Sequence, residues 1–400
     1  MALEIKIGDT MKKYIKSIIS MMIILTIGLS SLYAYKSNKN IFIEYATALN
    51  ILKPCYNASD DFFKIFAQEG INYSELEQKI TRKTQDKLSK IIANDNNKSK
   101  IPPITHHIYF TPEESSKQLN DFYNETMKAT FARLNNLNIK WNHYIWTNNP
   151  KIFPEDLKQI KGVEIKSIAE LSSHILYKDL VESIKNGEKQ KAYYSQASDI
   201  LRFLLVQKFG GIYGDMDYEI YNAKALYELM QNFDFIGGKE TSQDKSYYGS
   251  AFLAAKANHP ILNEIIKKYY RNAYDKNPPE YIKYPCRPTD GIYFNAPPLV
   301  TISFFKKNNI EENNDIILPS WMIFNVSFAR FKNKTCDYNS ITKSEAIKNN
   351  NNLAKLIEQF INKSDNHSNE KIIGADMFCG GWASGNKEIK KRIYYWSWKY

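Results

Sequence analysis

The segment SDILRFLLVQKFGGIYGDMD, residues 198–217, decides the fold that this sequence predicts. Its first part is apolar on most sides and carries Asp199 and Arg202 one helical turn apart, which indicates a buried helix with a charged pair on one face. Two glycines then end the helix, because glycine adopts the left-handed conformation of a helix C-terminus at little cost. A short strand follows, and Asp215 and Asp217 alternate along its end, so both carboxylates are expected on one side.

Both charged pairs of this segment also have a structural explanation. Asp199 and Arg202 are compatible with a salt bridge within the helix, since buried charges are paired or face a cleft. Asp215 and Asp217 are compatible with an acidic turn that closes a strand. Two adjacent carboxylates, however, repel each other unless a cation lies between them. A hard divalent cation with oxygen ligands meets that need and keeps coordination sites open for phosphate oxygens.

The segment resembles the sugar-binding region of Asp-x-Asp glycosyltransferases, above all family 32 and the large clostridial glucosylating toxins. The matching motifs are Ser-Asp-x-x-Arg at 198–202 and Gly-Gly-Ile-Tyr-x-Asp-x-Asp at 210–217. Gly214 stands where the family commonly has a larger residue. The resemblance implies a hexosyltransferase that moves a hexose from a nucleotide sugar (UDP- or GDP-hexose) to an acceptor, with retention at the anomeric carbon.

Looser matches extend the resemblance along the chain. The sequence IPPITHHIYF at 101–110 resembles the first strand of the family, and Tyr109 stands where relatives often have a tryptophan that stacks on the base. His106 and His107 are expected in that strand with a ring buried and hydrogen-bonded, because no zinc-ligand spacing lies nearby. The sequence WNHYIWT at 141–147 resembles the second strand.

The C-terminal part contains two competing matches to the family. The sequence FCGGWAS at 378–384 makes Trp382 a candidate substrate contact, although the family's usual histidine is absent and Asp376 is the nearest polar residue. The alternative is Trp-Ser-Trp at 396–398, which resembles the Ser-x-Trp motif of the toxins. Upstream, GSAFLAA at 249–255 resembles a strand that precedes a helix in the family.

The resemblance also assigns roles to the residues of the central segment. Asp217 would bind Mn²⁺ or Mg²⁺ directly, and Asp215 would assist through a metal-bound water or the ribose. Asp199 and Arg202 would hold the donor, the carboxylate through sugar hydroxyls and the guanidinium through the sugar or diphosphate oxygens. The cation would stabilise the departing diphosphate as a Lewis acid. No residue is identified as a covalent nucleophile, so the catalytic residues stay unassigned.

Several alternatives for the function remain open at this stage. A metal-dependent phosphoryl-transfer enzyme also uses paired aspartates, and a lectin-like module would need the pocket without the metal. Within the glycosyltransferases, the acceptor is either a glycan, such as a polysaccharide or oligosaccharide, or a host protein modified by a secreted effector or toxin. Acceptor choice depends on loops that carry no recognisable pattern.

The N-terminus predicts contact with a membrane. Residues 17–35 carry no acidic or basic side chain and follow Lys12, Lys13 and Lys16, which is typical of a signal-anchor whose N-terminus stays in the cytoplasm. A cleaved signal peptide and a buried core helix are the alternatives. The expected location is therefore a single-pass membrane protein, with secretion as the alternative.

Composition and segment patterns predict the organisation of the chain. The formal charge of +11 comes largely from scattered lysines without an arginine-rich stripe, so no nucleic-acid partner is expected. The four cysteines are far apart, which argues against a zinc ribbon and leaves their disulfide state open. We expect an anchor or signal peptide at 1–40, a helical accessory region at 41–100 and a glycosyltransferase domain at 101–400. That domain is expected to be α/β, with a GT-A, Rossmann-like nucleotide-sugar-binding fold and a C-terminal helical and aromatic tail.

Overall fold

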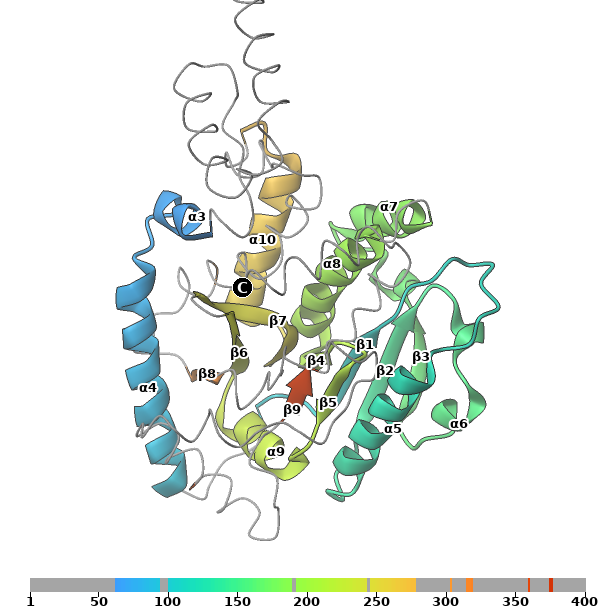
Figure 1. Ribbon diagram of the computed structural model, residues 1–400, viewed down its shortest axis with the longest axis horizontal. Helices are drawn as coiled ribbons and strands as arrows, with labels where there is room; N and C mark the ends of the chain where they lie inside the picture. The colour runs from blue at the N-terminus through green and yellow to red at the C-terminus, as the bar shows by residue number, and fades with distance from the viewer. Residues whose placement is uncertain are drawn as a thin grey trace, which may run out of the picture. The chain divides into compact units, whose positions relative to one another are not determined.

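A seven-stranded sheet with the order β3-β2-β1-β4-β7-β6-β8 organises the protein in this computed structural model (Figure 1). The structure describes residues 62–93, 100–188, 192–242, 245–277, 314–318 and 374–376, together with Ser303 and Gln359. All of them belong to one compact unit, Tyr56–Tyr400. The four cysteines and the uncharged segment 17–35 lie outside the described residues.

The sheet is mixed, with a parallel half and an antiparallel half. The parallel strands are β3 (Val163–Ser167), β2 (Asn142–Thr147), β1 (Ile104–Ile108) and β4 (Gly211–Gly214). The other half contains β7 (Lys245–Ala255), β6 (Phe235–Ser242) and β8 (Asp315–Leu318). Strand β7 runs antiparallel to both β4 and β6, while β8 is parallel to β6. The sheet is therefore parallel in one half only, because the consecutive strands β6 and β7 pair antiparallel.

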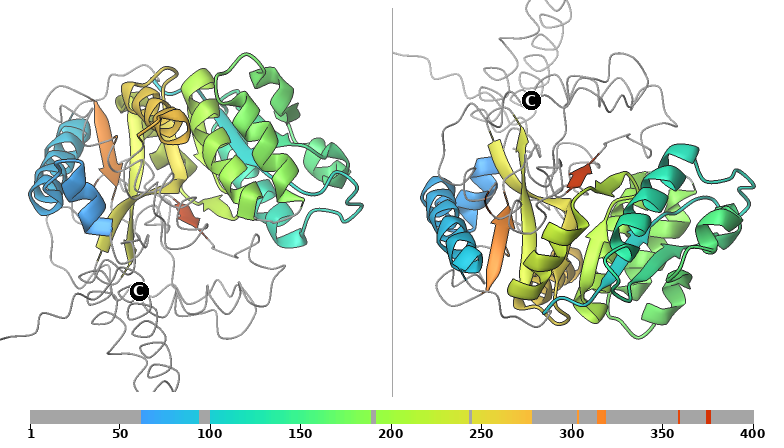
Figure 2. Two further views of the ribbon diagram at one scale, coloured as in Figure 1. Left: turned by 90° about the horizontal axis from the view of Figure 1, so that it is seen from above. Right: turned by 90° about the horizontal axis from the view of Figure 1, so that it is seen from below.

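Helices cover both faces of the sheet (Figure 2). One face packs against α7 (Tyr177–Gly187), α8 (Ala192–Phe209) and α10 (Pro260–Tyr274), and the other against α5 (Asp121–Asn135) and α9 (Ala223–Asn232). The alternation of strand residues produces this division: Tyr213 joins the first core and Ile212 the second. Shorter elements are α6 (Glu155–Lys158) and two single 3₁₀ turns, Pro150–Ile152 and Ile168–Leu171.

Helix α8 lies in the core, and two glycines connect its C-terminal end to strand β4. Residues 200–206 are all buried, as the apolar sequence predicted. The helix ends at Phe209, and Gly210 and Gly211 follow it with φ values of +68° and +97°. A Cβ at Gly211 would lie 2.5 Å from the carbonyl oxygen of Ile104, so a larger residue there would push β4 away from β1.

A small second sheet stands beside the main one. Strand β5 (Tyr218–Ile220) pairs antiparallel with β9 (Gly374–Asp376), and Asp376 lies opposite Tyr218. Strand β5 is also held by α5, because Arg133 forms an ion pair with Glu219 and donates to the carbonyl oxygen of Ile220. The chain just after β4 is therefore anchored to an early helix and to a strand from the far C-terminal part.

Within the predicted helical region 41–100, the described residues 62–93 form helices that pack on the sheet. These helices are α3 (Phe62–Gln68) and α4 (Tyr73–Ala93). Helix α4 lies beside β8, where Thr84 donates to the carbonyl oxygen of Ile317 at 3.2 Å. Lys268 of α10 forms a buried ion pair with Glu69 at 3.1 Å. The proposed boundaries at residues 40 and 100 remain predictions, but α4 clearly shares the core of the sheet, since Leu88 is fully buried in it.

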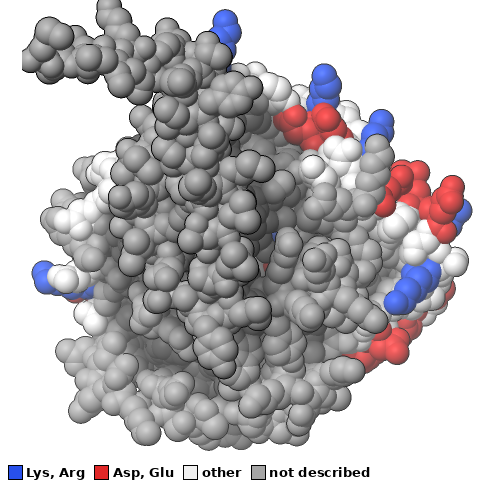
Figure 3. All heavy atoms as spheres, turned by 45° about the horizontal axis from the view of Figure 1, so that its top comes forward, with Lys and Arg blue, Asp and Glu red and all other residues white. Residues whose placement is uncertain are grey.

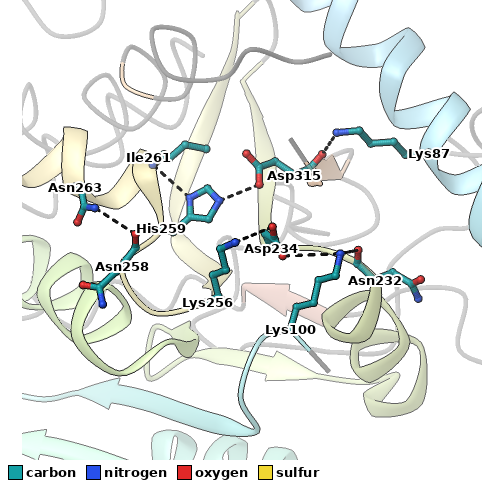
Figure 4. Close-up of polar contacts among 10 residues, drawn as sticks. All are labelled: Lys87, Lys100, Asn232, Asp234, Lys256, Asn258, His259, Ile261, Asn263 and Asp315. Atoms are coloured by element: carbon teal, nitrogen blue, oxygen red, sulfur yellow. Dashed lines mark hydrogen bonds and ion pairs between the residues drawn. The ribbon is translucent and has the colours of Figure 1, made fainter. Parts of the chain in front are cut away.

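A polar network links β6, β8 and α10 at the sheet edge where β6 and β8 begin (Figure 4). The backbone N–H of Ile261 donates to His259 Nδ1 at 3.3 Å, so His259 Nε2 carries the hydrogen and donates to Asp315 Oδ1 at 2.9 Å. Lys87 of α4 donates to the backbone oxygen of Asp315 at 2.8 Å. The network holds α4 and the start of α10 to β8.

Charged side chains of both signs lie side by side on the described part of the face in Figure 3. Ion pairs on α5 and α6 are of this kind, since Lys128 lies 2.7 Å from Asp156 and Lys158 lies 2.8 Å from Glu155. Such exposed pairs contribute little to stability, because water screens the two charges. Among the described residues, no helix has the length and apolar character that spanning a bilayer requires.

Candidate functional site

The Asp-x-Asp residues form a tight turn between β4 and β5. Strand β4 ends at Gly214, and the backbone N–H of Tyr218 donates to the carbonyl oxygen of Asp215 at 2.9 Å. The prediction that Asp215 and Asp217 alternate along a strand is therefore wrong. The chain must leave the main sheet to reach the β5–β9 pair, and the turn makes that change of direction. Both side chains remain partly exposed at the carboxyl end of β4.

The Asp215 carboxylate is held on one of its oxygens. Tyr213 donates its hydroxyl hydrogen to Asp215 Oδ1, and Arg202 Nη1 lies 3.5 Å from the same oxygen. The Asp215 side chain is 32% exposed. Burial raises the pKa of Tyr213 well above its usual value, against the opposing effect of Arg202, so Tyr213 is a neutral donor.

Arg202 lies at the centre of the cluster, with a side chain that is only 8% exposed. Its Nη2 lies 2.8 Å from Asp199 Oδ1, and its Nη1 donates to the carbonyl oxygen and the Oγ of Ser250 at 2.7 and 3.1 Å. Its guanidinium carbon stacks 4.8 Å from the centre of the Tyr213 ring. The intrahelical salt bridge therefore forms, and the same guanidinium also reaches β7 and the Asp215 turn.

The Asp199 carboxyl has an unusual proton affinity. Burial raises its pKa to about 6, Arg202 opposes that rise, and the nearby Asp215 adds to it. Its side chain is 13% exposed. Asp199 is thus ionised at neutral pH and becomes protonated in mild acid.

A comparison with known protein families identifies this cluster. Residues 124–242 match the family described as the glycosyltransferase sugar-binding region containing a DXD motif. Residues 124–242 are thus the sugar-binding region of an Asp-x-Asp glycosyltransferase. The matched range runs from α5 to the end of β6 and includes Asp199, Arg202 and the Asp215 turn. The mixed sheet, covered by helices on both faces, agrees with the α/β fold class that the resemblance implied.

Solved structures with a weak likeness to the chain include two that are titled as glycosyltransferases. The structure titled "PaToxG Glycosyltransferase" is 15% identical, with 60% of this chain and 80% of that chain covered and a TM-score of 0.37. The ligand-free glycosyltransferase domain from the YGT toxin is 9% identical, with coverages of 55% and 80% and a TM-score of 0.39. At these scores the likeness defines no residue correspondence. No curated protein sequence matches the chain.

The buried histidines of the glycosyltransferase support the strands behind the site. Trp146 Nε1 donates to His106 Nδ1 at 3.2 Å, so His106 Nε2 carries the hydrogen and donates to the carbonyl oxygen of Gly210 at 2.9 Å. Burial lowers the pKa of His106 and of His107 to about 4, so both rings are neutral. The prediction of a buried, hydrogen-bonded histidine in this strand is confirmed.

Tyr109 follows β1 at the same edge of the sheet as the Asp215 turn, because β1 and β4 are parallel neighbours. The centre of its ring lies 5.7 Å from the ring centre of Tyr123 and 6.4 Å from that of Phe153. Burial raises the pKa of Tyr109, so its hydroxyl stays protonated. The predicted contact Trp382 and the alternative motif at 396–398 lie outside the described residues.

Strand β9 contains Asp376, which the sequence singled out only because it is the polar residue nearest to the FCGGWAS motif at 378–384. Asp376 lies opposite Tyr218 in the β5–β9 pair, one residue beyond the Asp-x-Asp turn. The segment 374–376 is short and has no local pattern that predicts its partner strand. Its pairing with β5 brings the backbone of the C-terminal part next to the turn.

The carboxylates of the glycosyltransferase suit a hard divalent cation. Asp215 and Asp217 lie in one turn, and within the described part of the chain no hydrogen bond or ion pair reaches Asp215 Oδ2. The described residues contain no group of three or more His, Cys, Asp or Glu side chains that could hold a metal by themselves. A cation here would therefore take its other oxygen ligands from the donor diphosphate, water or residues beyond the described ranges.

Proposed function

We propose that this glycosyltransferase transfers a hexose from a UDP- or GDP-hexose to a glycan acceptor, in a reaction that requires Mn²⁺ or Mg²⁺ and retains the anomeric configuration. The proposal combines the family match with the geometry around the Asp-x-Asp turn. The alternatives of a phosphoryl-transfer enzyme and a lectin-like module lose their support, because the matched region is a glycosyltransferase region.

The observation that best supports the proposal is how the Asp215 carboxylate is held and exposed. Tyr213 and Arg202 approach one oxygen of this carboxylate, and about a third of the side chain is exposed where β4 ends. Ligands of α/β sheets bind at the carboxyl ends of the strands. A carboxylate that is held on its inner oxygen and open on the other is suited to bind a cation at that edge.

Asp215 and Asp217 are the residues that would hold the cation. When bound, a divalent cation supplies Lewis-acid stabilisation of the negative charge that develops on the departing diphosphate. The turn closed by the Tyr218 N–H fixes the spacing of the two carboxylates, and the Ala251 carbonyl fixes the backbone N–H of Asp215 at 2.9 Å. Such fixed oxygen ligands lower the reorganisation that binding would otherwise require.

Asp199, Arg202 and Tyr109 would hold the donor. The Asp199 carboxylate is ionised at pH 7 and can accept hydrogen bonds from sugar hydroxyls. Arg202 keeps that carboxylate in place through the 2.8 Å ion pair and lowers its charge repulsion with Asp215. Tyr109, at the end of β1, would stack on the base, and Trp382 would contact the donor from the C-terminal part.

The acceptor and the location are further parts of the proposal. A glycan acceptor is proposed over a host protein because the uncharged segment 17–35 would tether the enzyme to a membrane, where lipid-linked and surface glycans are assembled. Secretion and modification of a protein are the competing outcome. The two alternatives differ in which acceptor, a glycan or a protein, receives the transferred hexose.

A donor-hydrolysis assay tests the proposal directly. Purified protein is incubated with UDP-glucose, UDP-galactose, UDP-N-acetylglucosamine and GDP-mannose, with Mn²⁺, Mg²⁺ or EDTA, and the anomer released is identified by NMR. We expect one nucleotide sugar to be cleaved with retention and only with a divalent cation. Full hydrolysis in EDTA contradicts the metal requirement, and an inverted product contradicts retention. Acceptor panels of glycans and of proteins then separate the two acceptor classes.

A further inference from the structure

Ser250 on β7 contacts the central arginine of the site and has no role in the proposal above. It is buried, with 5% of its surface exposed. Its carbonyl oxygen and its Oγ both accept from Arg202 Nη1, at 2.7 and 3.1 Å. The next residue, Ala251, accepts from the backbone N–H of Asp215. Two consecutive residues of one antiparallel strand therefore hold Arg202 and the Asp-x-Asp turn.

Both acceptors of Ser250 contact the same nitrogen of Arg202, Nη1. A terminal guanidinium nitrogen carries two N–H groups and cannot accept, so the serine Oγ is the acceptor. The same nitrogen is 3.5 Å from Asp215 Oδ1, which is longer than a charge-assisted hydrogen bond of about 2.7 to 2.9 Å. By contrast, Nη2 is 2.8 Å from Asp199. Ser250 thus makes the two shorter contacts of Nη1, and Asp215 makes the longer one.

A closer contact between Arg202 and Asp215 would weaken the binding of a cation by that carboxylate. A guanidinium that turned both hydrogens of Nη1 towards Asp215 would neutralise that carboxylate and occupy its inner oxygen more tightly. Arginine forms such close carboxylate pairs readily where water is excluded, and this side chain is only 8% exposed. An acceptor that competes for Nη1 leaves more negative charge on Asp215.

We propose that Ser250 is a positioning residue, which keeps Arg202 at a distance from Asp215 so that the carboxylate can bind the divalent cation. This inference rests on the metal site of the proposed function. A purely structural role for Ser250 would lower the stability of the β7–α8 contact but would not change the affinity for the cation.

The test measures Mn²⁺ binding without any donor, by the electron paramagnetic resonance signal of free Mn²⁺. The variants are Ser250→Ala, which removes the Oγ acceptor, and Ser250→Thr, which keeps it. Ser183→Ala is the matched control, because it removes the same hydroxyl from a buried serine on α7. We expect Ser250→Ala to weaken Mn²⁺ binding about tenfold, as loss of one hydrogen bond to a charged group does. Ser250→Thr and Ser183→Ala should bind Mn²⁺ like the unmodified protein.

A second comparison shows whether the effect passes through Arg202. In an Arg202→Gln background, adding Ser250→Ala should leave the Mn²⁺ affinity unchanged, because no guanidinium remains to turn. Donor hydrolysis by Ser250→Ala should recover at saturating Mn²⁺. Unchanged Mn²⁺ affinity in Ser250→Ala, or an equal loss in the Arg202→Gln background, overturns the inference while leaving the proposed function intact. An unmodified protein that binds no Mn²⁺ and hydrolyses donor in EDTA overturns both.

Discussion

Tyr213 donates its hydroxyl hydrogen to Asp215 Oδ1, so the residue two positions before the first aspartate of the Asp-x-Asp motif orients that aspartate. The two residues lie on either side of Gly214, at the end of β4. Arg202 stacks on the Tyr213 ring from α8 and lies 3.5 Å from the same carboxylate oxygen. The tyrosine thus connects the core helix to the metal-binding turn proposed above.

Replacing Tyr213 with phenylalanine tests this connection. We expect kcat/KM for donor hydrolysis to fall about tenfold, because a hydrogen bond to a charged group contributes about 1.5 to 3 kcal/mol. The ring that supports Arg202 remains, so the melting temperature should change little. Tyr221→Phe is the matched control, since it removes a hydroxyl that donates to Glu219 Oε2 at 3.1 Å beside the same turn. Equal activity losses in the two variants would argue against a specific role for Tyr213.

Replacing the carboxylates of the turn should stop turnover without unfolding the protein. Asp215→Asn and Asp217→Asn remove charge that would bind the cation, and metal stabilisation of a leaving group is worth several kcal/mol, so kcat should fall by about 10³-fold or more. Donor hydrolysis, Mn²⁺ binding and thermal melts are measured together. Asp156→Asn, an exposed acid that pairs with Lys128, is the charge-matched control. Substantial turnover by the double variant would rule out the metal assignment.

The raised pKa of Asp199 predicts that kcat/KM declines on the acid side of its pH profile. Its pKa is raised to about 6 by burial, so the carboxylate that would bind the donor is lost as the pH falls through 6. We expect kcat/KM to decline about tenfold per pH unit below that point, as for one essential ionised group in the free enzyme. Asp199→Asn should be less active and should lack this limb. A profile that stays flat down to pH 5 would contradict the assigned role.

The buried histidines predict acid sensitivity of the fold. Burial lowers the pKa values of His106 and His107 to about 4 and that of His143 to about 3, whereas the unfolded chain protonates histidine near 6.5. Below pH 6.5 the unfolded state therefore binds more protons than the folded state. The free energy of unfolding decreases as the pH is lowered from 6.5 to about 4. The slope is about 1.4 kcal/mol per pH unit for each histidine.

Urea unfolding at several pH values between 7 and 4.5 measures that slope. His143→Phe should flatten it, because one titrating group is removed while stacking on Phe131, at 4.2 Å between ring centres, is retained. The variant also loses the hydrogen bond to Thr105, so its stability at pH 7 is the reference for its own series. An identical slope in the variant would show that His143 does not contribute to acid unfolding.

Truncations at two points separate the membrane segment from the core helices. Protein that begins near Ser37 lacks segment 17–35 and should be soluble and hydrolyse the donor, because every site residue lies after Ile101. Protein that begins at Ile101 also lacks α3 and α4, which exposes the core around Leu88 and removes the ion pair between Glu69 and Lys268.

We therefore expect the shorter truncation to remain folded and the longer one to aggregate or unfold. Detergent-free solubility and the thermal melt of each protein are the measurements. Precipitation of the protein that begins near Ser37, with a soluble full-length chain, would identify segment 17–35 as a core helix and contradict the membrane tether. A stable protein from Ile101 onwards would show that α3 and α4 are dispensable.

The sequence alone determined the local unit on which the site is built. The apolar helix, the two glycines and the strand from 198 to 214 form as predicted, because helix burial and glycine conformation depend on neighbouring residues. The position of Asp199 and Arg202 on one helical face follows from their spacing of three. The buried state of His106 follows equally from its place in an apolar strand.

Only the tertiary structure decided what surrounds that unit. Ser250 lies 48 residues from Arg202 in the chain, and Asp376 pairs with β5 across a far longer separation. The antiparallel course of β7 and the turn at Asp215 also depend on which strands meet. A contact between distant segments leaves no periodic pattern in either one, because it arises from the burial and hydrogen bonding that the whole sheet satisfies together.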